Sequence, residues 1–442
     1  MLKFVAPMLY ALNVCGVYYF ARRALNWSVR KGLVAAFFFA FQLALLRLSW
    51  HSYRNMLGLA ILLFTLPLFK NTKTKKGFAW LVLLSILVVF SHEYASVIMF
   101  TVILGIIASD FLKGERTRIL KVVAAIFPAL IIFLTSVYLI LFPVPFHVET
   151  NIITVNDTLN PSSGKLFFLV DYLNVVSPIE HYPTYLDLVS RVFTLFSILY
   201  LLWLPLVFVG FFTDKVLNGW TVLLLVGSFN SLITPFFALE LWFRWMFMLV
   251  YPFTFYAVNA IQKVLESQSK GVAPSFRWMN WMKVSRRGVL GISLSTVLLG
   301  TLFMATPLFF GRFGVFSIPN INTYFPSTML HNTVPLQDVK STIQVMEWLN
   351  TNMIDGSCVV LLDAFQRWSD LYLDKKHTVV SFTIDMEKAL NVALKHGFDP
   401  IYLIWWRENI GWYGGLTVPS YFESIFSSER ISIFKYYTSS YT

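Results

Sequence analysis

Long apolar stretches, separated by short charged loops, fill most of the first 310 residues. A helix that crosses the hydrocarbon core of a bilayer needs about 20 mostly apolar residues, and somewhat fewer where its ends are recessed. We therefore expect an α-helical polytopic membrane protein with about ten transmembrane helices. The ten predicted spans are residues 2–21, 32–48, 55–69, 77–91, 94–109, 120–142, 192–212, 216–234, 242–262 and 288–310.

The pattern changes after residue 310, where charged residues return and the apolar segments become short. A linker rich in Pro, Asn and Gly leads into alternating elements, which predict a small, mainly parallel sheet with flanking helices. The predicted helices are 338–353, 385–396 and 420–427, and the predicted strands are 358–362, 377–382, 401–406 and 431–436. We expect two domains: a transmembrane domain at 1–310, with a long outer loop at 143–190, and an extracytoplasmic α/β domain at 311–442.

The charge pattern indicates which face of the membrane each loop occupies. Only 13% of the residues are charged and the net charge is +12, whereas soluble domains carry about 25% charged residues. Most of the positive excess lies in short loops between apolar spans, and such loops stay in the cytoplasm. This placement argues against nucleic-acid binding and favours a multi-pass membrane protein. The basic residues of these loops are Arg22, Arg23, Arg30, Lys31, Lys70, Lys73, Lys75, Lys76, Lys113, Arg116, Arg118, Lys121, Lys215, Lys263, Lys270, Arg277, Lys283, Arg286 and Arg287.

This orientation has a consequence for the start of the chain. The first span, 2–21, must run from outside to inside, with Met1 on the outer side and no signal peptide before it. A nascent chain rarely inserts in that way with so few flanking residues. We therefore expect a further span and outer loop upstream of this sequence.

Two outer corners between short spans carry polar residues at membrane depth. Residues 47–55 contain His51 and Arg54, and residues 91–94 contain His92 and Glu93. Charges at this depth are costly and often functional, so we expect these side chains to line a shared polar cavity. The alternative is that each long side chain reaches the interface without a binding role.

A third feature combines an acidic and a basic residue at helical spacing. Glu240 and Arg244 are four residues apart, which places them on one face of a helix as an ion pair. The guanidinium of Arg244 matches the geometry of a phosphate at the membrane surface. We expect Arg244 to bind phosphate with Glu240 holding it in place, although an interfacial clamp without a ligand remains the alternative. The sequence contains no zinc-type spacing, glycine-rich phosphate loop or nucleophile elbow.

The layout resembles the GT-C superfamily of membrane glycosyltransferases, which includes the protein mannosyltransferases, the lipid A aminoarabinose transferases and the catalytic subunit of oligosaccharyltransferase. The resemblance covers nearly the whole chain and is one of arrangement more than of sharp motifs. The segments that carry it are 18–23 (YYFARR), 49–55 (SWHSYRN), 90–94 (FSHEY), 240–244 (ELWFR) followed by Tyr251 and Pro252, and 345–350 (VMEWLN) before the strand 358–362.

The resemblance implies transfer of a sugar from a polyprenyl-phosphate-linked donor to a glycan, protein or lipid acceptor on the outer face of the membrane, and it implies the plasma membrane as the location. In the family, Arg244 would contact the lipid phosphate, and His51, Arg54, His92 and Glu93 would line the donor cavity or help to bind a divalent cation. The family's catalytic aspartate lies on the first outer loop, which would precede Met1, so no catalytic residue is assigned here. The WWDYG motif of oligosaccharyltransferase is absent, because residues 361–368 read LLDAFQRW.

Other classes of membrane protein stay open as alternatives. A transporter predicts internal repeats and helices broken by Gly or Pro near the midplane, and the sequence shows neither pattern. A polysaccharide polymerase or ligase would not explain the α/β domain. A non-catalytic, scaffold-like relative would fit the absent first loop.

Overall fold

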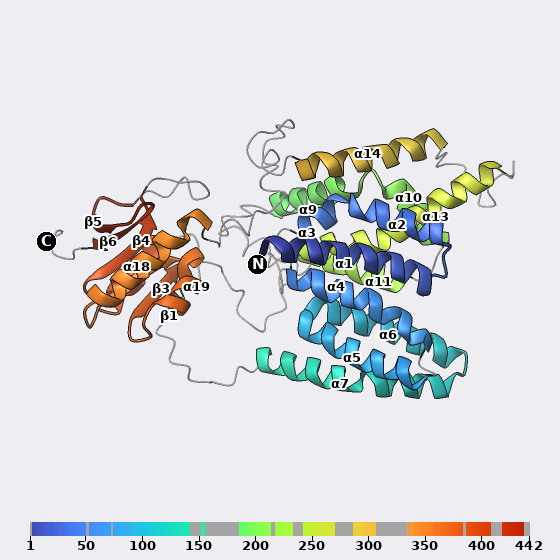
Figure 1. Cartoon of the computed structure of the whole chain (residues 1–442), viewed down its shortest axis with the longest axis horizontal. Helices are drawn as coiled ribbons and strands as arrows, with labels where there is room; N and C mark the ends of the chain where they lie inside the picture. Colours follow the sequence, from blue (N-terminus) through green and yellow to red (C-terminus); the bar gives the residue numbers. More distant parts are fainter. Residues whose placement is uncertain are drawn as a thin grey trace. The chain divides into compact units, whose positions relative to one another are not determined.

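The protein divides into two compact units, which are described separately (Figure 1). The helical unit comprises Met1–Val144 and Leu166–Phe325, and the α/β unit comprises Pro145–Lys165 and Pro326–Thr442. The α/β unit therefore includes part of the loop expected at 143–190. The computed structural model describes residues 2–49, 53–71, 74–141, 152–154, 185–213, 217–232, 242–269, 286–305, 334, 336–382, 386–407 and 418–436.

Among the described residues, four helices of the helical unit are long and apolar enough to cross a membrane. Their apolar portions are Phe4–Arg23, Glu93–Leu112, Arg116–Leu139 and Arg287–Met304. The parent helices are α1 (Leu2–Arg23), α6 (Glu93–Leu112), α7 (Arg116–Leu141) and α14 (Arg286–Ala305). The protein is thus mainly helical, with several apolar helices suited to a membrane, as the sequence predicted.

The expected count of about ten spans is not confirmed, because several apolar segments are short or broken. Helices α9 (Tyr185–Tyr200) and α10 (Leu204–Thr213) form a pair bent by 83°. The segment predicted at 32–48 divides into α2 (Val29–Ala40) and α3 (Leu43–Leu48), and the segment at 242–262 divides into α12 (Trp242–Met248) and α13 (Val250–Ser269). The remaining helices are α4 (Tyr53–Thr65) followed by a 3-10 turn (Leu66–Asn71), α5 (Lys75–Ser91), and α11 (Asn218–Phe229) followed by a 3-10 turn (Asn230–Leu232).

Close approaches between helices hold the core of the helical unit together. Helix α1 packs against α2 and α4, and α10 packs against α13. A Cβ atom at Gly210 would lie 2.3 Å from the backbone oxygen of Tyr256, so the contact between α10 and α13 requires glycine at this position. A buried hydrogen bond of 2.6 Å from the Tyr251 hydroxyl to Asn13 Oδ1 links α13 to α1. Such bonds satisfy polar groups that would otherwise be costly to bury.

The α/β unit contains a six-stranded sheet in the order β1-β3-β2-β4-β6-β5 (Figure 1). Strands β1 (Ile152–Thr154), β3 (Thr378–Phe382), β2 (Cys358–Leu362) and β4 (Ile401–Trp406) are parallel to one another, and β6 (Ile431–Tyr436) and β5 (Phe422–Ser427) extend the sheet as an antiparallel pair. The helices are α18 (Val339–Asn352), α19 (Asp363–Tyr372) and α20 (Met386–Lys395). A short 3-10 turn, Leu336–Asp338, precedes α18.

Most of the predicted α/β elements are confirmed, with one error and two omissions. The segment predicted as a helix at 420–427 is strand β5, because its backbone pairs with β6 through a register shift between Ser424 and Phe426. Helix α19 was not predicted, since it follows β2 without any intervening turn residue. Strand β1 was not predicted either. It comes from the loop after α7 and adds to the edge of the sheet beside β3.

Candidate functional site

The corner between α5 and α6 is built around His92. This residue adopts an extended backbone conformation, and its Nδ1 atom accepts a hydrogen bond of 3.1 Å from the backbone N–H of Tyr94. His92 therefore acts as the N-cap of α6, and its side chain is buried. Because Nδ1 accepts this bond, we assign the neutral ring with its proton on Nε2. The 3.5 Å distance from Nδ1 to Glu93 Oε2 is then a polar contact without opposite charges.

Helix α4 brings Arg54 to the same corner. The Nε atom of Arg54 donates a hydrogen bond of 3.3 Å to the carbonyl oxygen of Ser91, the last residue of α5. One turn further along, a Cβ atom at Gly58 would lie 2.9 Å from Ala95 Cβ and 3.3 Å from His92 Cβ. The absence of a side chain at Gly58 thus allows α4 to approach the corner closely.

Helix α12 brings Arg244 to this corner from a distant part of the chain. The charges of Arg244, Arg54 and Glu93 all act on the His92 ring, which places the four side chains in one neighbourhood. The ring of Trp245 packs against the ring of Tyr94 with 4.7 Å between centroids. The Nε atom of Arg244 is buried and has no hydrogen-bond partner among the residues that the structure describes. A buried donor without a partner is uncommon and calls for an explanation, of which a bound ligand is one.

The structure therefore brings together four of the six predicted site residues: Arg54, His92, Glu93 and Arg244. Two others, His51 and Glu240, lie outside the described residues, so the expected pairing of Glu240 with Arg244 stays a prediction. We call the four residues the polar corner. Its two arginines and single carboxylate give it a net positive charge.

Three residues that contact α6 or α12, the helices of Glu93 and Arg244, were not singled out from the sequence. Arg47 lies on α3, is 1% exposed, and has its guanidinium carbon 5.8 Å from the centroid of the Phe247 ring of α12. The other two are Tyr94 and Trp245. Arg47 could have been found from its position in an apolar stretch, because charged residues at membrane depth are rare. The aromatic pair carries no such signal, since aromatic residues are common throughout this chain.

Metal binding requires a cluster of suitable ligand side chains. Among the described residues, no group of three or more His, Cys, Asp or Glu side chains could hold a metal ion. Divalent cations are normally held by several carboxylate or imidazole ligands, so the described part of the polar corner fits an anion better than a cation. A comparison of the chain with models of known protein families and with characterised proteins finds no match.

Proposed function

We propose that this protein is a membrane glycosyltransferase that moves a sugar from a polyprenyl-phosphate-linked donor to a glycan, protein or lipid acceptor. The observation that carries the proposal is the buried Nε atom of Arg244, which has no described partner, on a residue whose charge acts on His92 together with that of Arg54. A guanidinium presents several N–H donors in a planar fork that matches phosphate oxygens. A phosphate bound there would supply the missing acceptor.

The proposed reaction develops negative charge next to Arg244. The acceptor oxygen forms a bond to the anomeric carbon of the sugar and loses its proton to a base, which we do not assign. The bond between the anomeric carbon and the phosphate oxygen breaks, and the electron pair leaves with the polyprenyl phosphate. Arg244 and Arg54 would stabilise the charge on this leaving group, an effect that is strong where water is excluded.

The arrangement of α6 and α7 supports an outer position for the polar corner. These two antiparallel helices are joined by a tight turn at Lys113–Glu115 that adjoins Arg116 and Arg118. Basic turns stay in the cytoplasm, which puts the opposite end of α6, with Glu93, at the outer face. Strand β1 follows α7 in the chain and pairs with β3, which favours an extracytoplasmic α/β unit. We propose the plasma membrane as the location, with membrane lipids as the surroundings of the helical unit.

The proposal is tested by measuring sugar transfer from a radiolabelled polyprenyl-phosphate sugar. The full-length gene product, including any upstream segment, would be assayed in lipid vesicles as wild type and as the Arg244→Ala and Arg244→Lys variants. We expect Arg244→Ala to lower the transfer rate by about 10²- to 10³-fold and Arg244→Lys to recover part of it. The matched control is Arg116→Ala, which removes an exposed arginine at the start of α7. Equal transfer by Arg244→Ala and wild type would contradict the assignment.

A transporter is the second candidate, and a specific observation favours it. The 83° bend between α9 and α10, together with the break between α2 and α3, gives the unit interrupted helices. The sequence did not lead us to expect such breaks, which in transporters line substrate sites. The same vesicles distinguish the two functions. A transporter would move the labelled lipid headgroup or sugar across the bilayer without forming a product, and a scaffold-like relative would do neither.

A further inference from the structure

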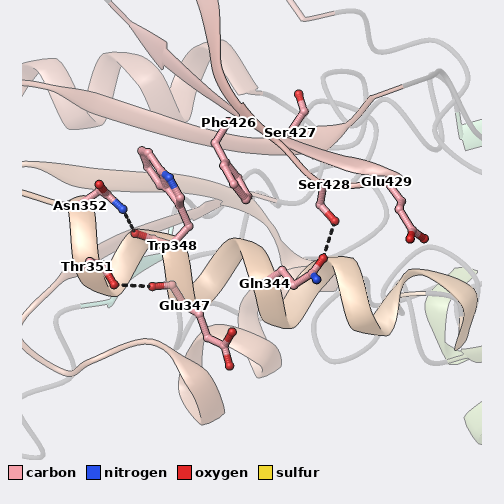
Figure 2. A pocket seen from close by; sticks show the side chains of 9 residues that line it. All are labelled: Gln344, Glu347, Trp348, Thr351, Asn352, Phe426, Ser427, Ser428 and Glu429. Atoms are coloured by element: carbon pink, nitrogen blue, oxygen red, sulfur yellow. Dashed lines mark hydrogen bonds between the residues drawn. The ribbon is translucent and has the colours of Figure 1, made fainter.

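A groove of about 600 Å³ lies in the α/β unit between α18 and the hairpin formed by β5 and β6. Figure 2 shows its lining side chains, which come from residues 344–352 of the helix, from the end of β5 and from the turn that follows it. The groove consists entirely of residues of the α/β unit and is separate from the polar corner of the helical unit. It contains aromatic, amide, hydroxyl and carboxylate groups.

The apolar part of the groove is a pair of stacked rings. Trp348 of α18 and Phe426 of β5 lie nearly parallel, with 5.3 Å between centroids and 20° between planes (Figure 2). Trp348 also meets the Tyr402 ring edge-on at 6.4 Å, which fixes the orientation of the indole. Both Trp348 and Phe426 are only half-buried, so part of this aromatic surface faces the groove. An indole that is held in place and partly exposed offers a flat apolar surface to a ligand.

The polar part of the groove is held in place before any ligand binds. The Ser428 hydroxyl donates a hydrogen bond of 2.8 Å to Gln344 Oε1 and so joins the hairpin turn to the helix (Figure 2). At the other end, Asn352 Nδ2 donates a bond of 2.8 Å to the Trp348 carbonyl oxygen. Polar groups fixed in this way lower the conformational entropy that binding would otherwise cost.

The charge of the groove restricts what can bind. Glu347 and Glu429 are exposed at its edge, and neither forms an ion pair with another described residue. No lysine or arginine is among the described residues that line the groove. The two carboxylates therefore repel phosphate and carboxylate ligands. They accept hydrogen bonds from hydroxyl groups and attract amines.

We propose that this groove binds a saccharide without phosphate or carboxylate groups, and prefers one that carries an amine. A pyranose ring has a face of C–H groups that fits the exposed part of the Trp348 and Phe426 ring surfaces, and its many hydroxyls match the surrounding amide, hydroxyl and carboxylate groups. Amino groups on the saccharide would also be attracted by the exposed carboxylates of Glu347 and Glu429. A role in holding a glycan acceptor rests on the proposed transferase function, but saccharide binding itself does not depend on it.

Binding is measured on the full chain in lipid nanodiscs, because sugar-based detergents would compete for the groove. The probes are a glucosamine disaccharide, cellobiose and a disaccharide of glucuronic acid. Their binding is detected by saturation-transfer NMR. We expect the glucosamine disaccharide to bind about tenfold more tightly than cellobiose, and the glucuronic acid probe to bind least. Tenfold corresponds to about 1.4 kcal/mol, the size of one charge-assisted contact. No binding of any probe, or equal binding of all three, would overturn the proposal.

Matched variants assign the binding to the groove. The double variant Glu347→Gln and Glu429→Gln changes only exposed side chains, so the fold should persist and the preference for the amine should disappear while cellobiose still binds. Trp348→Phe should weaken all saccharides, and Glu387→Gln, an exposed carboxylate on α20, should change nothing. Binding that is unaffected by both groove variants would refute the site. If the wild-type protein binds the saccharide but transfers no sugar, only the proposed transferase function is refuted. If it transfers sugar but binds none of the saccharide probes, only this inference is refuted.

Discussion

The ring of Trp245 packs against the ring of Tyr94, with 4.7 Å between centroids, and this contact joins α12 to the start of α6. Each ring adjoins a charged residue of the polar corner, because Arg244 precedes Trp245 and Glu93 precedes Tyr94 in the chain. The aromatic pair therefore controls how far the guanidinium lies from the corner of α5 and α6. It is a positioning contact, and it can be tested apart from the charges themselves.

Replacing Gly227 by alanine should disturb the contact between Trp245 and Tyr94. A Cβ atom at Gly227 of α11 would lie 2.6 Å from Cδ2 of the Trp245 indole, so Gly227→Ala must displace the ring. Overpacking of this kind costs about 1–3 kcal/mol. We expect a lower thermal stability in lipid nanodiscs and, under the proposed function, slower sugar transfer. Gly219→Ala on the same helix is the control, because a Cβ atom there meets nothing within 4 Å. Equal effects of the two substitutions would argue against a positioning role for Trp245.

Substitutions of His92 should separate its capping role from any binding role. His92→Ala removes the acceptor for the Tyr94 N–H, and loss of an N-cap costs about 0.5–2 kcal/mol. Asn is a good N-cap residue, so His92→Asn should keep most of the stability. Thermal unfolding and sugar transfer are measured for both variants. If transfer falls in His92→Asn while the melting temperature is retained, the imidazole itself contributes to the site. If the transfer rate and the melting temperature of His92→Asn both equal the wild-type values, His92 is a capping residue only.

The thiol of Cys358 should report the unfolding of the α/β unit. Cys358 is fully buried in β2, and this burial raises the pKa of its thiol to about 12. Thiolates are the reactive form, so a maleimide reagent should label Cys358 only when the unit opens. The measurement uses a Cys15→Ser background, because Cys15 is exposed on α1. Rapid labelling of the folded protein at neutral pH would contradict the buried position of β2.

Asp338 should be a major contributor to the stability of this unit. Its side chain is buried, Oδ2 accepts a hydrogen bond of 2.9 Å from Trp406 Nε1, and Oδ1 accepts one from Arg430 Nε. Asp338→Ala removes both acceptors and should lower the free energy of unfolding by roughly 1–3 kcal/mol. Labelling of Cys358 in increasing urea measures the change. Asp370→Ala is the control, since its pair with the exposed Arg367 on α19 should contribute at most about 1 kcal/mol.

The α/β unit should also lose stability in mild acid because of His377. Burial, followed by the charge of Lys376, lowers the pKa of the His377 ring below its usual value. The unfolded chain then binds a proton more readily than the folded chain, so this contribution is complete above about pH 6.5 and is lost as the pH falls through the folded-state pKa. Cys358 labelling in urea from pH 7.5 to 5 follows the effect. His377→Gln should reduce the acid sensitivity, whereas His396→Gln, at an exposed position, should leave it unchanged.

Local patterns were enough to predict much of this protein. The sequence predicted β2, β3, β4 and β6 from short apolar runs, such as Cys358–Leu362, and from the alternation of elements after residue 338. A buried strand can be recognised in this way because it needs only local β propensity and an apolar run. Apolar length predicted α1, α6, α7 and α14 for a similar reason. Charges placed in apolar surroundings led us to expect Arg54, His92 and Glu93 in one polar cavity, since their cost favours a shared polar environment. Arg244 was joined to them only by the family resemblance.

Other features depend on contacts between residues far apart in the chain, and no local pattern encodes them. Residues 422–427 are a strand and not a helix because β6 supplies the hydrogen-bond partners. Strand β1 exists because β3 offers a free edge to a segment more than 200 residues earlier in the chain. The approach of Arg244 to His92 depends on Trp245 packing between Gly227 and Tyr94. Apolar composition measures how strongly a segment avoids water. The bends, the edge strand and the buried Nε atom of Arg244 are set by which surfaces fit together once the chain has folded.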